Sequence, residues 1–313
     1  MTSKNSLKRL LLRLIIVLLA LIANLAAYIY FRPLEFSEIM TEISFFRSGV
    51  QNIESNGLKG YYRDFCQGNQ DCACVALVHG LGDYAMTWYK VLNSPAEKFT
   101  TPMKLYAFHL PGTYGSQTPS DLTGYKVRTM ANTVADAMKP FCKKWTVVGN
   151  SLGGLVTLWL VADHPDMINN MALENAAGMS HPIEDERVSR MLTQPTLESL
   201  KEFRKLAYAN PQSLPDYAWR GAVRWQKKSP AYVMMKAQTI EGYPNDQVLA
   251  SIQVPVHLVW GIADQVMPVS RAYEFKTKLK NTVLKEIPNC GHLPHKECLD
   301  DFLAALNVTV QMK

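Results

Sequence analysis

Short apolar runs alternate with longer amphipathic segments through most of the chain. Each short run leads into glycine, proline or polar residues, which is the pattern of a buried strand. These runs lie at residues 74–80, 103–112, 145–151, 171–178 and 254–261. Segments between them, such as 127–139 and 152–163, have helical length and periodicity. The alternation predicts an α/β fold in which a mostly parallel sheet carries helices on both faces.

One interval, residues 181–246, breaks this alternation because it contains no clear strand. Leu197, Leu200, Phe203 and Leu206 recur there at helical spacing, and aromatic and methionine side chains follow. We expect a helical cap over the carboxyl ends of the strands, where ligands bind in such sheets. Its aromatic and methionine side chains either pack together or line an apolar cleft. The cap divides the predicted core into residues 57–180 and 247–313.

The N-terminal segment is expected to be a signal anchor over residues 1–32. The eighteen residues from Leu14 to Phe31 contain one strongly polar side chain, Asn24, and would form a helix of about 27 Å, enough to span a bilayer core. Four positive charges precede them, so the positive-inside rule keeps the N-terminus cytoplasmic and places the body outside the cytoplasm. Residues 33–56 are predicted to be a juxtamembrane connector. A cleaved signal peptide is the alternative, but this apolar core is longer than usual and offers no Ala-x-Ala site.

The charge of the chain is concentrated in that anchor. The 313 residues include 33 basic and 27 acidic ones, a formal charge of +6. Residues 1–32 hold five basic residues and no acidic one, which leaves 28 basic against 27 acidic residues in the body. Nucleic-acid binding needs basic side chains clustered on the folded domain, so a nearly neutral body argues against it. A composition with 48% hydrophobic and 19% charged residues also excludes a disordered chain.

Six cysteines suit an exported body, in which disulfides persist. Cys66 and Cys72 flank a polar turn and form one candidate pair, and Cys290 and Cys298 form another. Six cysteines allow fifteen pairings, and the sequence does not choose among them. Cys74 lies close to the first pair, but no histidine or second cysteine pair stands at a zinc-like spacing. We therefore expect neither a metal nor a cofactor.

The strongest chemical motif is Gly149-Asn-Ser151-Leu-Gly153, which lies between a predicted strand and a predicted helix. A sharp strand-to-helix turn leaves no room for side chains at its flanking positions, so the two glycines relieve crowding and expose the serine. Ser151 would then stand at a helix N-terminus, which favours developing negative charge. The motif predicts a serine nucleophile; a glycine-rich helix start made only for packing is the alternative.

A serine hydroxyl needs a base, and the base needs an acid that orients it. Asp264 follows the strand 254–261, and His292 follows a glycine at the end of a later short strand. The order Ser151, Asp264, His292 is the order expected for this fold class. His295 is a rival base, and Glu174, after the strand 171–178, is a rival acid. The other histidines are expected to be structural or surface groups.

Two main-chain amides are expected to bind the oxyanion of an acyl-transfer reaction. One is the amide of Leu152, directly after the serine. The other is the amide of Leu81 in His79-Gly-Leu-Gly82, where the glycines let the chain fold so that this amide points inward. A plain turn with two glycines is the alternative for that loop.

With these motifs in order, the chain resembles the α/β-hydrolase superfamily. The matching segments are VHGLG, LPGTYGS, VGNSLGG, WGIADQVMP and NCGHLPHKE, which together cover residues from about 57 to 306. The resemblance implies the same fold and the roles given above for Ser151, Asp264, His292, Leu81 and Leu152. Glu297, five residues after the histidine, also matches a common family position.

One loop departs from the family pattern. His109 stands where the family usually has an acidic residue before the Leu-Pro-Gly stretch, and the second glycine comes one position late, at Gly115. That loop borders the entrance of the site in the family, so the departure concerns the substrate and leaves the triad untouched.

The anchor and the size of the cap resemble membrane-anchored monoacylglycerol lipases and related bacterial lipases and esterases. We therefore expect a serine hydrolase without a cofactor that cleaves lipid-like carboxylic esters, such as monoacylglycerols or short and medium acyl esters. The turn Gly-Asn-Ser-Leu-Gly-Gly equally resembles carbon-carbon bond hydrolases of aromatic degradation. Acyl transfer to an acceptor other than water is also open. A non-enzymatic binding module would be expected to have lost the nucleophile or the base, and both are present.

Overall fold

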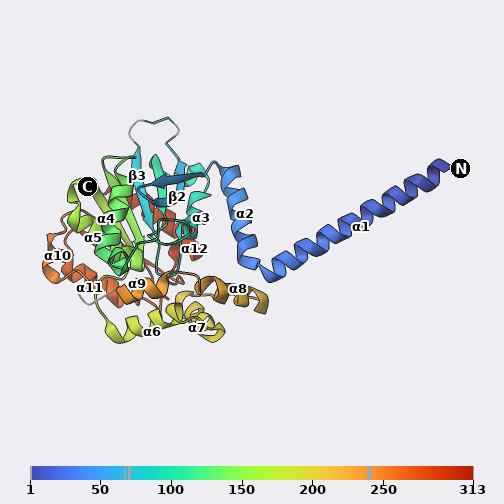
Figure 1. Ribbon diagram of the computed structural model, residues 1–313. Helices are drawn as coiled ribbons and strands as arrows, with labels where there is room; N and C mark the ends of the chain where they lie inside the picture. Colours follow the sequence, from blue (N-terminus) through green and yellow to red (C-terminus); the bar gives the residue numbers. More distant parts are fainter. Residues whose placement is uncertain (1, 67, 70–71, 238–241, 313) are drawn as a thin grey trace.

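The computed structural model describes residues 2–66, 68–69, 72–237 and 242–312 (Figure 1). Its eight strands form one sheet in the order β1-β2-β4-β3-β5-β6-β7-β8. Strand β2 runs antiparallel to β1 and β4, and the remaining neighbours are parallel, which confirms the predicted mostly parallel sheet. The strands are β1 (Gln51–Ser55), β2 (Leu58–Asp64), β3 (Ala73–Val78), β4 (Met103–Phe108), β5 (Trp145–Asn150), β6 (Ile168–Glu174), β7 (Val256–Gly261) and β8 (Thr282–Ile287).

Helices cover both faces of the sheet because its central strands are apolar on both sides. Along β3, Ala76 and Val78 enter one core cluster while Val75 and Leu77 enter the other. The first core is covered by α4 (Val127–Met138), α5 (Leu152–Asp163), α10 (Asp246–Ser251) and α11 (Ser270–Lys278). The second is covered by α3 (Tyr89–Leu92) and α13 (Leu299–Gln311), with the short helix α12 (Pro294–Glu297) beside them.

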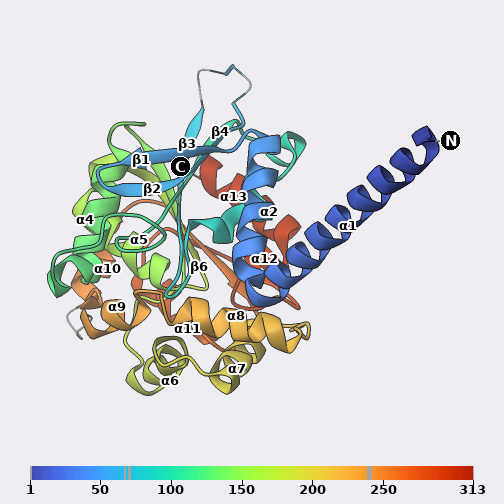
Figure 2. The same ribbon diagram turned by 45° about the vertical axis from the view of Figure 1, so that its right-hand side comes forward.

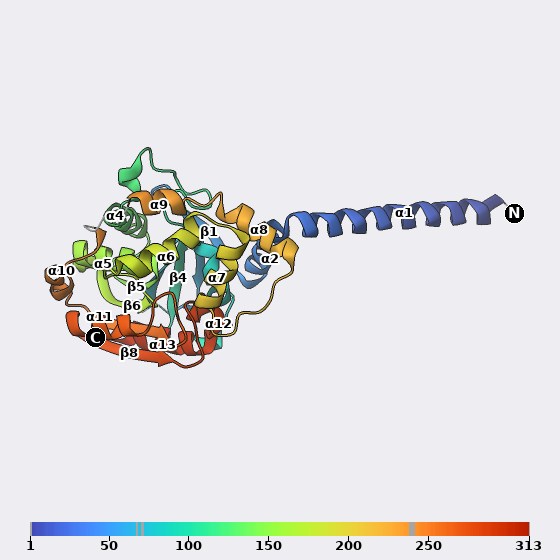
Figure 3. The same ribbon diagram turned by 90° about the horizontal axis from the view of Figure 1, so that it is seen from below.

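Four helices form a layer across the carboxyl ends of the parallel strands, at the bottom of Figure 1. Figure 3 views this layer from below and shows it lying over the sheet. The helices are α6 (Pro182–Thr193), α7 (Leu197–Ala207), α8 (Asp216–Gln226) and α9 (Ala231–Ala237). They occupy the interval in which the sequence showed no strand, and we refer to them as the cap.

The N-terminal region consists of two helices, α1 (Thr2–Phe31) and α2 (Pro33–Ser48), that meet at a bend at Arg32. The proline at the start of α2 cannot donate the hydrogen bond that a continuous helix would need there. Within α1, residues Leu10–Phe31 are long and apolar enough to cross a membrane, with a mean hydropathy of 2.6, and lie away from the body (Figure 1).

Residues 33–56, predicted as a juxtamembrane connector, form helix α2 and strand β1. Phe45 of α2 is 2% exposed and packs into the second core beside Tyr61 of β2. The sequence did not reveal β1 because its five residues carry mostly polar side chains at the edge of the sheet. Since only one neighbour pairs with an edge strand, such a strand needs no continuous apolar run.

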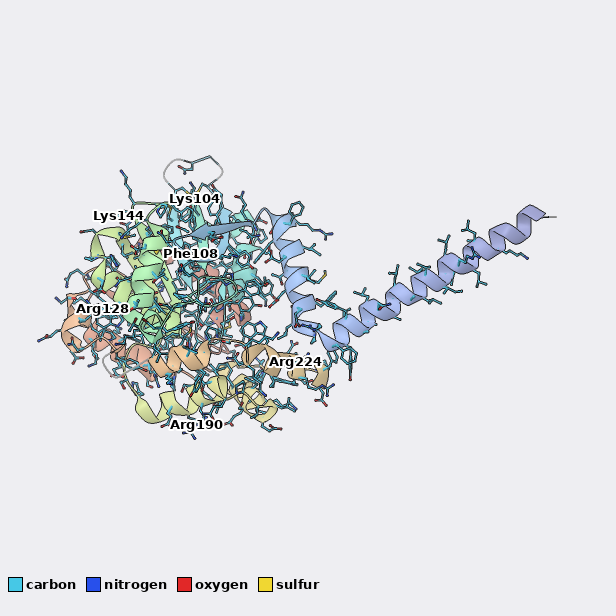
Figure 4. The ribbon with its side chains drawn as sticks, viewed as in Figure 1. Lys104, Phe108, Arg128, Lys144, Arg190 and Arg224 are labelled. Carbon is cyan, nitrogen blue, oxygen red and sulfur yellow. A yellow bond between two sulfur atoms is a disulfide. The ribbon has the colours of Figure 1, made fainter. Side chains whose placement is uncertain are left out.

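The bend between α1 and α2 rests on cap helix α8 (Figure 2). The guanidinium of Arg224 donates a hydrogen bond to the carbonyl of Phe31, at the junction where Figure 4 labels this arginine. The ring of Tyr30 packs against that of Tyr217, with their centroids 5.5 Å apart. At Gly221 a Cβ atom would lie 2.7 Å from Pro33, so a larger residue would push the two helices apart. The end of the apolar helix is thus attached to the cap.

Three disulfides join the six cysteines, two of them being the pairs that the sequence suggested, Cys66–Cys72 and Cys290–Cys298. The third, Cys74–Cys142, links the start of β3 to the segment before β5. The sequence did not suggest it because 68 residues separate its cysteines, which only the parallel pairing of β3 with β5 brings together.

Candidate active site

The turn between β5 and α5 presents Ser151 at the carboxyl edge of the sheet. Ser151 has a φ of 55° and a ψ of −121°, a conformation that non-glycine residues rarely adopt. A Cβ atom at Gly149 would collide with the carbonyl of Gly153, and one at Gly153 would collide with the carbonyl of Val78. The crowding that the sequence predicted at the two flanking glycines is therefore present.

His292 and Asp264 come together at the same edge, from loops that follow β8 and β7. The Nδ1 atom of His292 lies 2.7 Å from Oδ2 of Asp264, and both side chains are buried. The other carboxylate oxygen of Asp264 accepts the amides of Val266 and Met267 at 2.7 and 3.0 Å. Because every contact of this carboxylate is a hydrogen bond that it accepts, it fits the ionised form, and Nδ1 of His292 carries the proton.

Two asparagines that the sequence analysis did not single out support these residues. The amide nitrogen of Asn175 donates to Oδ2 of Asp264 at 2.6 Å. The amide nitrogen of Asn150 donates to the carbonyl of His292 at 3.0 Å. Asn150 directly precedes Ser151, and Asn175 follows β6 with a φ of 43°, a conformation that asparagine tolerates better than most residues. In the sequence, each of these asparagines could have been noticed as a polar side chain at the end of an apolar run, where the site was expected.

The loop after β3 approaches the serine closely. A Cβ atom at Gly80 would lie 3.1 Å from the Cβ of Ser151, so a glycine permits this approach. Leu81 and Leu152, whose amides were expected to bind an oxyanion, line the same cavity as Ser151. His79 fastens the loop: Nε2 accepts the amide of Leu110 at 3.0 Å, so Nδ1, 2.9 Å from the carbonyl of Gly80, donates to that carbonyl.

His109, where the chain departs from the family pattern, is a structural histidine. It is 2% exposed, and its Nδ1 accepts the amide of Ala85 at 3.1 Å. Burial, assisted by nearby His79, lowers the pKa of His109 to about 3. A histidine that stays neutral in the folded protein can accept this hydrogen bond at neutral pH.

Ser151 and His292 open onto one cavity of about 310 Å³ under the cap. Its lining is mostly apolar and comes from several elements: Leu34 of α2, Leu200 and Phe203 of α7, and Trp219 and Trp225 of α8. Three charged side chains also reach it, namely Asp83, Arg204 and Lys296. Side chains of the cap thus line an apolar cavity that contains the serine, which was one of the two interpretations of the cap sequence.

The rival acid and base, Glu174 and His295, contact each other. Both carboxylate oxygens of Glu174 lie 2.9 Å from Nδ1 of His295, and both side chains are fully buried. The structure therefore brings together Asp264 with His292 and, separately, Glu174 with His295.

Glu297, which matches a common family position, is part of neither pair. Its carboxylate accepts the amides of Gly291 at 2.8 Å and of Asn210 at 3.1 Å, next to the cap.

One group of side chains of metal-binding type occurs among the described residues: Asp64, Cys66 and Cys72. Its two cysteines are joined in a disulfide, so they offer no thiolate ligands. The donor set does not fit a metal centre.

The sheet order, the serine on its sharp turn and the capped cavity define an α/β hydrolase. The family model of the alpha/beta hydrolase fold matches residues 74–297, and the chain belongs to this family. Among curated proteins, it is 23% identical to the monoacylglycerol lipase ABHD6 of Homo sapiens over 266 residues, 75% of this chain and 76% of that protein.

Two solved structures illustrate the range of the fold. A membrane phospholipase A, described as a bacterial virulence factor, has a TM-score of 0.74 at 23% identity and covers 96% of this chain and 99% of its own. The 2-hydroxy-6-oxo-6-phenylhexa-2,4-dienoate hydrolase of Rhodococcus sp. strain RHA1 has a TM-score of 0.69 at 22% identity, over 84% of this chain and 99% of its own. The predicted resemblance to the superfamily and to its lipase and esterase members is confirmed.

Proposed function

We propose that this protein is a membrane-anchored serine hydrolase that cleaves lipid-like carboxylic esters. The observation that carries the proposal is the placement of Ser151 and His292 on one apolar cavity, with His292 held by Asp264. A hydroxyl, a base and a buried carboxylate in this relation are what nucleophilic acyl transfer requires.

In the proposed reaction, the Oγ of Ser151 attacks the ester carbonyl while Nε2 of His292 takes its proton. Asp264 stabilises the resulting imidazolium through the Nδ1 hydrogen bond. The tetrahedral intermediate collapses when His292 returns the proton to the leaving alcohol, which leaves an acyl group on Ser151. Water, deprotonated by His292, then attacks the acyl group, and the carboxylic acid departs as the serine regains its proton.

The amides of Leu81 and Leu152 are proposed to bind the oxyanion of both tetrahedral intermediates. Support comes from the close approach of Gly80 to Ser151 and from the position of Leu152 at the start of α5. Each such donor typically contributes about 10²- to 10³-fold in rate.

The lipid-like substrate is inferred from the cavity and its position. The cap supplies apolar side chains, and Leu34, two residues after the bend that follows the apolar helix, belongs to the same wall. One residue of the cavity wall thus lies three positions along the chain from the end of the helix that would lie in a bilayer. Monoacylglycerols and esters of short or medium acyl chains fit this environment, and the activity named for the human relative is of the same class.

We propose further that α1 remains as a single-pass anchor with its N-terminus in the cytoplasm and the body outside it. The contact of Arg224 with Phe31 supports retention of the helix, because a cleaved peptide would not be built into the body. Three disulfides agree with an oxidising compartment. A C-terminal alkaline phosphatase fusion, active only when exported, tests the orientation, and the mass of the purified membrane form tests retention.

The activity is tested with monoacylglycerols and p-nitrophenyl esters of increasing chain length, on the full chain in detergent. Ser151→Ala is expected to abolish turnover and labelling by a fluorophosphonate. Ser94→Ala is the matched control, since Ser94 is buried and its hydroxyl donates a hydrogen bond to the carbonyl of Lys90. Equal turnover by wild type and Ser151→Ala would refute the mechanism.

A second candidate, carbon-carbon bond hydrolysis, is favoured by the Gly-Asn-Ser-Leu-Gly-Gly turn and by the fold of the Rhodococcus hydrolase. The same assay with a ring-cleavage dienoate in place of the ester decides between the two. Turnover of the dienoate at a higher kcat/KM than any ester would replace the ester proposal.

Acyl transfer to an acceptor other than water is tested by product analysis with added glycerol, because the same acyl-enzyme would then yield an ester in place of the acid.

A further inference from the structure

We propose that Glu174 and His295 are positioning residues: a second buried histidine-carboxylate pair, bridged by Thr87 to the wall of the cavity, that holds the turn of Ser151 and the loop of His292 in place. The inference rests on the proposed function, since it concerns the geometry of the same nucleophile. It differs from the catalytic pair because neither Glu174 nor His295 lines the cavity.

The pair belongs to a continuous chain of hydrogen bonds. Glu174, at the end of β6, contacts Nδ1 of His295 at 2.9 Å and also accepts its main-chain amide at 2.8 Å. Nε2 of His295 lies 3.0 Å from the hydroxyl of Thr87, in the short helical turn Ala85–Trp88, and this hydroxyl donates to Asp83 at 2.7 Å. The ring of His295 also packs on that of Trp88, with centroids 4.1 Å apart.

The donors and acceptors fix where the protons stand. Thr87 has one hydroxyl proton and gives it to the carboxylate of Asp83, so Nε2 of His295 must donate to Thr87. Nδ1 of His295 faces a carboxyl group, so one further proton lies between His295 and Glu174. The chain leaves no polar atom of His295 unpaired, although the side chain is fully buried. Loss of a single member would leave a buried donor without a partner.

Glu174 transmits this arrangement to the nucleophile. Its main-chain carbonyl accepts the amide of Ser151 at 3.2 Å and the side-chain amide of Asn150, also at 3.2 Å. Asn150 in turn donates to the carbonyl of His292, three residues before His295. The next residue after Glu174, Asn175, donates to Asp264. The end of β6 thus contacts Ser151 directly, Asp264 through Asn175, and the loop of His292 through Asn150.

The other end of the chain reaches the wall of the cavity. Asp83 and Lys296 both line it and form an ion pair at 3.2 Å. Burial disfavours the charge of Asp83, but Lys296 and the Thr87 hydroxyl outweigh burial and lower the pKa of Asp83. Asp83 therefore remains an acceptor for Thr87 at neutral pH, and the chain runs unbroken from the cavity wall to the back of the serine turn.

The test removes single hydroxyl or carboxyl groups from the full chain in detergent. Thr87→Val keeps the volume but removes the bridge, and Thr87→Ser restores the hydroxyl. Glu174→Leu removes both acceptors, and Glu174→Gln keeps an oxygen for the amide of His295. Thr309→Val is the matched control, because the Thr309 hydroxyl also bonds a buried histidine, His257 at 2.8 Å, but near the opposite end of β7.

Each variant is measured for kcat and KM on p-nitrophenyl butyrate, for the rate of fluorophosphonate labelling, and for thermal unfolding. We expect kcat and the labelling rate to fall about tenfold or more in Thr87→Val and Glu174→Leu, with KM within about twofold, since small misplacements of reacting groups cost this much. Thr87→Ser, Glu174→Gln and Thr309→Val are expected to stay within about threefold of wild type.

Two outcomes would overturn the proposal. Suppose that Thr87→Val lowers the unfolding temperature as much as Thr309→Val but is labelled and turns over ester at the wild-type rate. The pair would then contribute to packing alone. If KM rises while kcat is unchanged, the residues act on substrate binding. If Glu174→Leu does not fold, the result for Thr87→Val decides between these outcomes. An unlabelled Ser151 in the wild type would instead refute the proposed function, which separates the two failures.

Discussion

Asp264 accepts two hydrogen bonds on a single carboxylate oxygen, one from Nδ1 of His292 at 2.7 Å and one from the amide nitrogen of Asn175 at 2.6 Å. This double contact fixes both the orientation of the imidazole and the nitrogen that bears its proton. The remaining nitrogen, Nε2, is then free of that proton and suited to accept one from Ser151.

Asp264→Asn tests this relationship. The new amide would keep its oxygen toward the amides of Val266 and Met267, so its nitrogen would face both His292 and Asn175. A donor there forces the proton of the imidazole onto Nε2, and kcat is expected to fall about 10³- to 10⁴-fold. Steady-state kinetics and the thermal unfolding curve measure the change. If Asp264→Asn lost less than tenfold while Glu174→Gln lost 10³-fold, the orienting acid would be Glu174.

The disulfide Cys290–Cys298 encloses the loop that carries His292 and His295. Replacing both cysteines by alanine releases a loop with a sequence separation of 8, and is expected to lower the free energy of unfolding by roughly 2–3 kcal/mol. Since the loop holds the base, kcat should fall as well, severalfold at a temperature at which the variant is folded. Denaturant titration and ester kinetics give the two numbers.

The double alanine variant of Cys66 and Cys72 is the matched control for that experiment. It opens a loop of sequence separation 6 whose second cysteine directly precedes β3, at the strand end opposite the serine and the cap. A comparable loss of stability with unchanged kcat is expected. Equal losses of kcat in both double variants would show that the effect is one of global stability and not of the histidine loop.

The central strands could be predicted because burial on both faces demands continuous apolar runs. Ser151 and Asp264 were found as candidates because each follows such a run, and His292 because it follows a glycine after a short strand. Strand β1 and helix α2 were missed for the opposite reason: an edge strand and a half-covered helix need few apolar positions. Glu174 and His295 were found only as rivals, because the contact between them spans 121 residues and depends on how two strand ends are placed. Neither spacing nor composition encodes such a contact.

The pKa of His109 predicts a specific loss of stability in acid. Burial, with a smaller contribution from His79, lowers the pKa of His109 to about 3 in the folded state, whereas it is about 6.5 in an unfolded chain. Below pH 6.5 the unfolded state therefore binds a proton that the folded state does not, so this group's contribution is fully present above pH 6.5. It declines as the pH falls toward 3, by about 1.4 kcal/mol per pH unit.

His109→Asn removes this dependence while its oxygen can still accept the amide of Ala85. Free energies of unfolding from denaturant titrations at pH 7.5 and pH 5 are compared for the two proteins. Between these values, the variant is expected to gain about 2 kcal/mol relative to wild type. Parallel pH profiles would mean that burial does not lower the pKa of His109 in the folded protein.

The contact between the cap and the apolar helix predicts a difference between substrates. Arg224 donates to the carbonyl of Phe31, and Arg220 donates to the hydroxyl of Tyr30 at 3.2 Å. If these bonds keep the cavity at the bilayer, replacing both arginines by leucine should lower the hydrolysis of monoacylglycerol in vesicles severalfold and leave a soluble short-chain ester unaffected. Arg190→Leu is the control, because Arg190 lies on α6 at the lower edge of Figure 4 and pairs with Glu186 of its own helix. Equal losses on both substrates would place the effect in the cavity itself, and no loss on either would show that the anchor works without this contact.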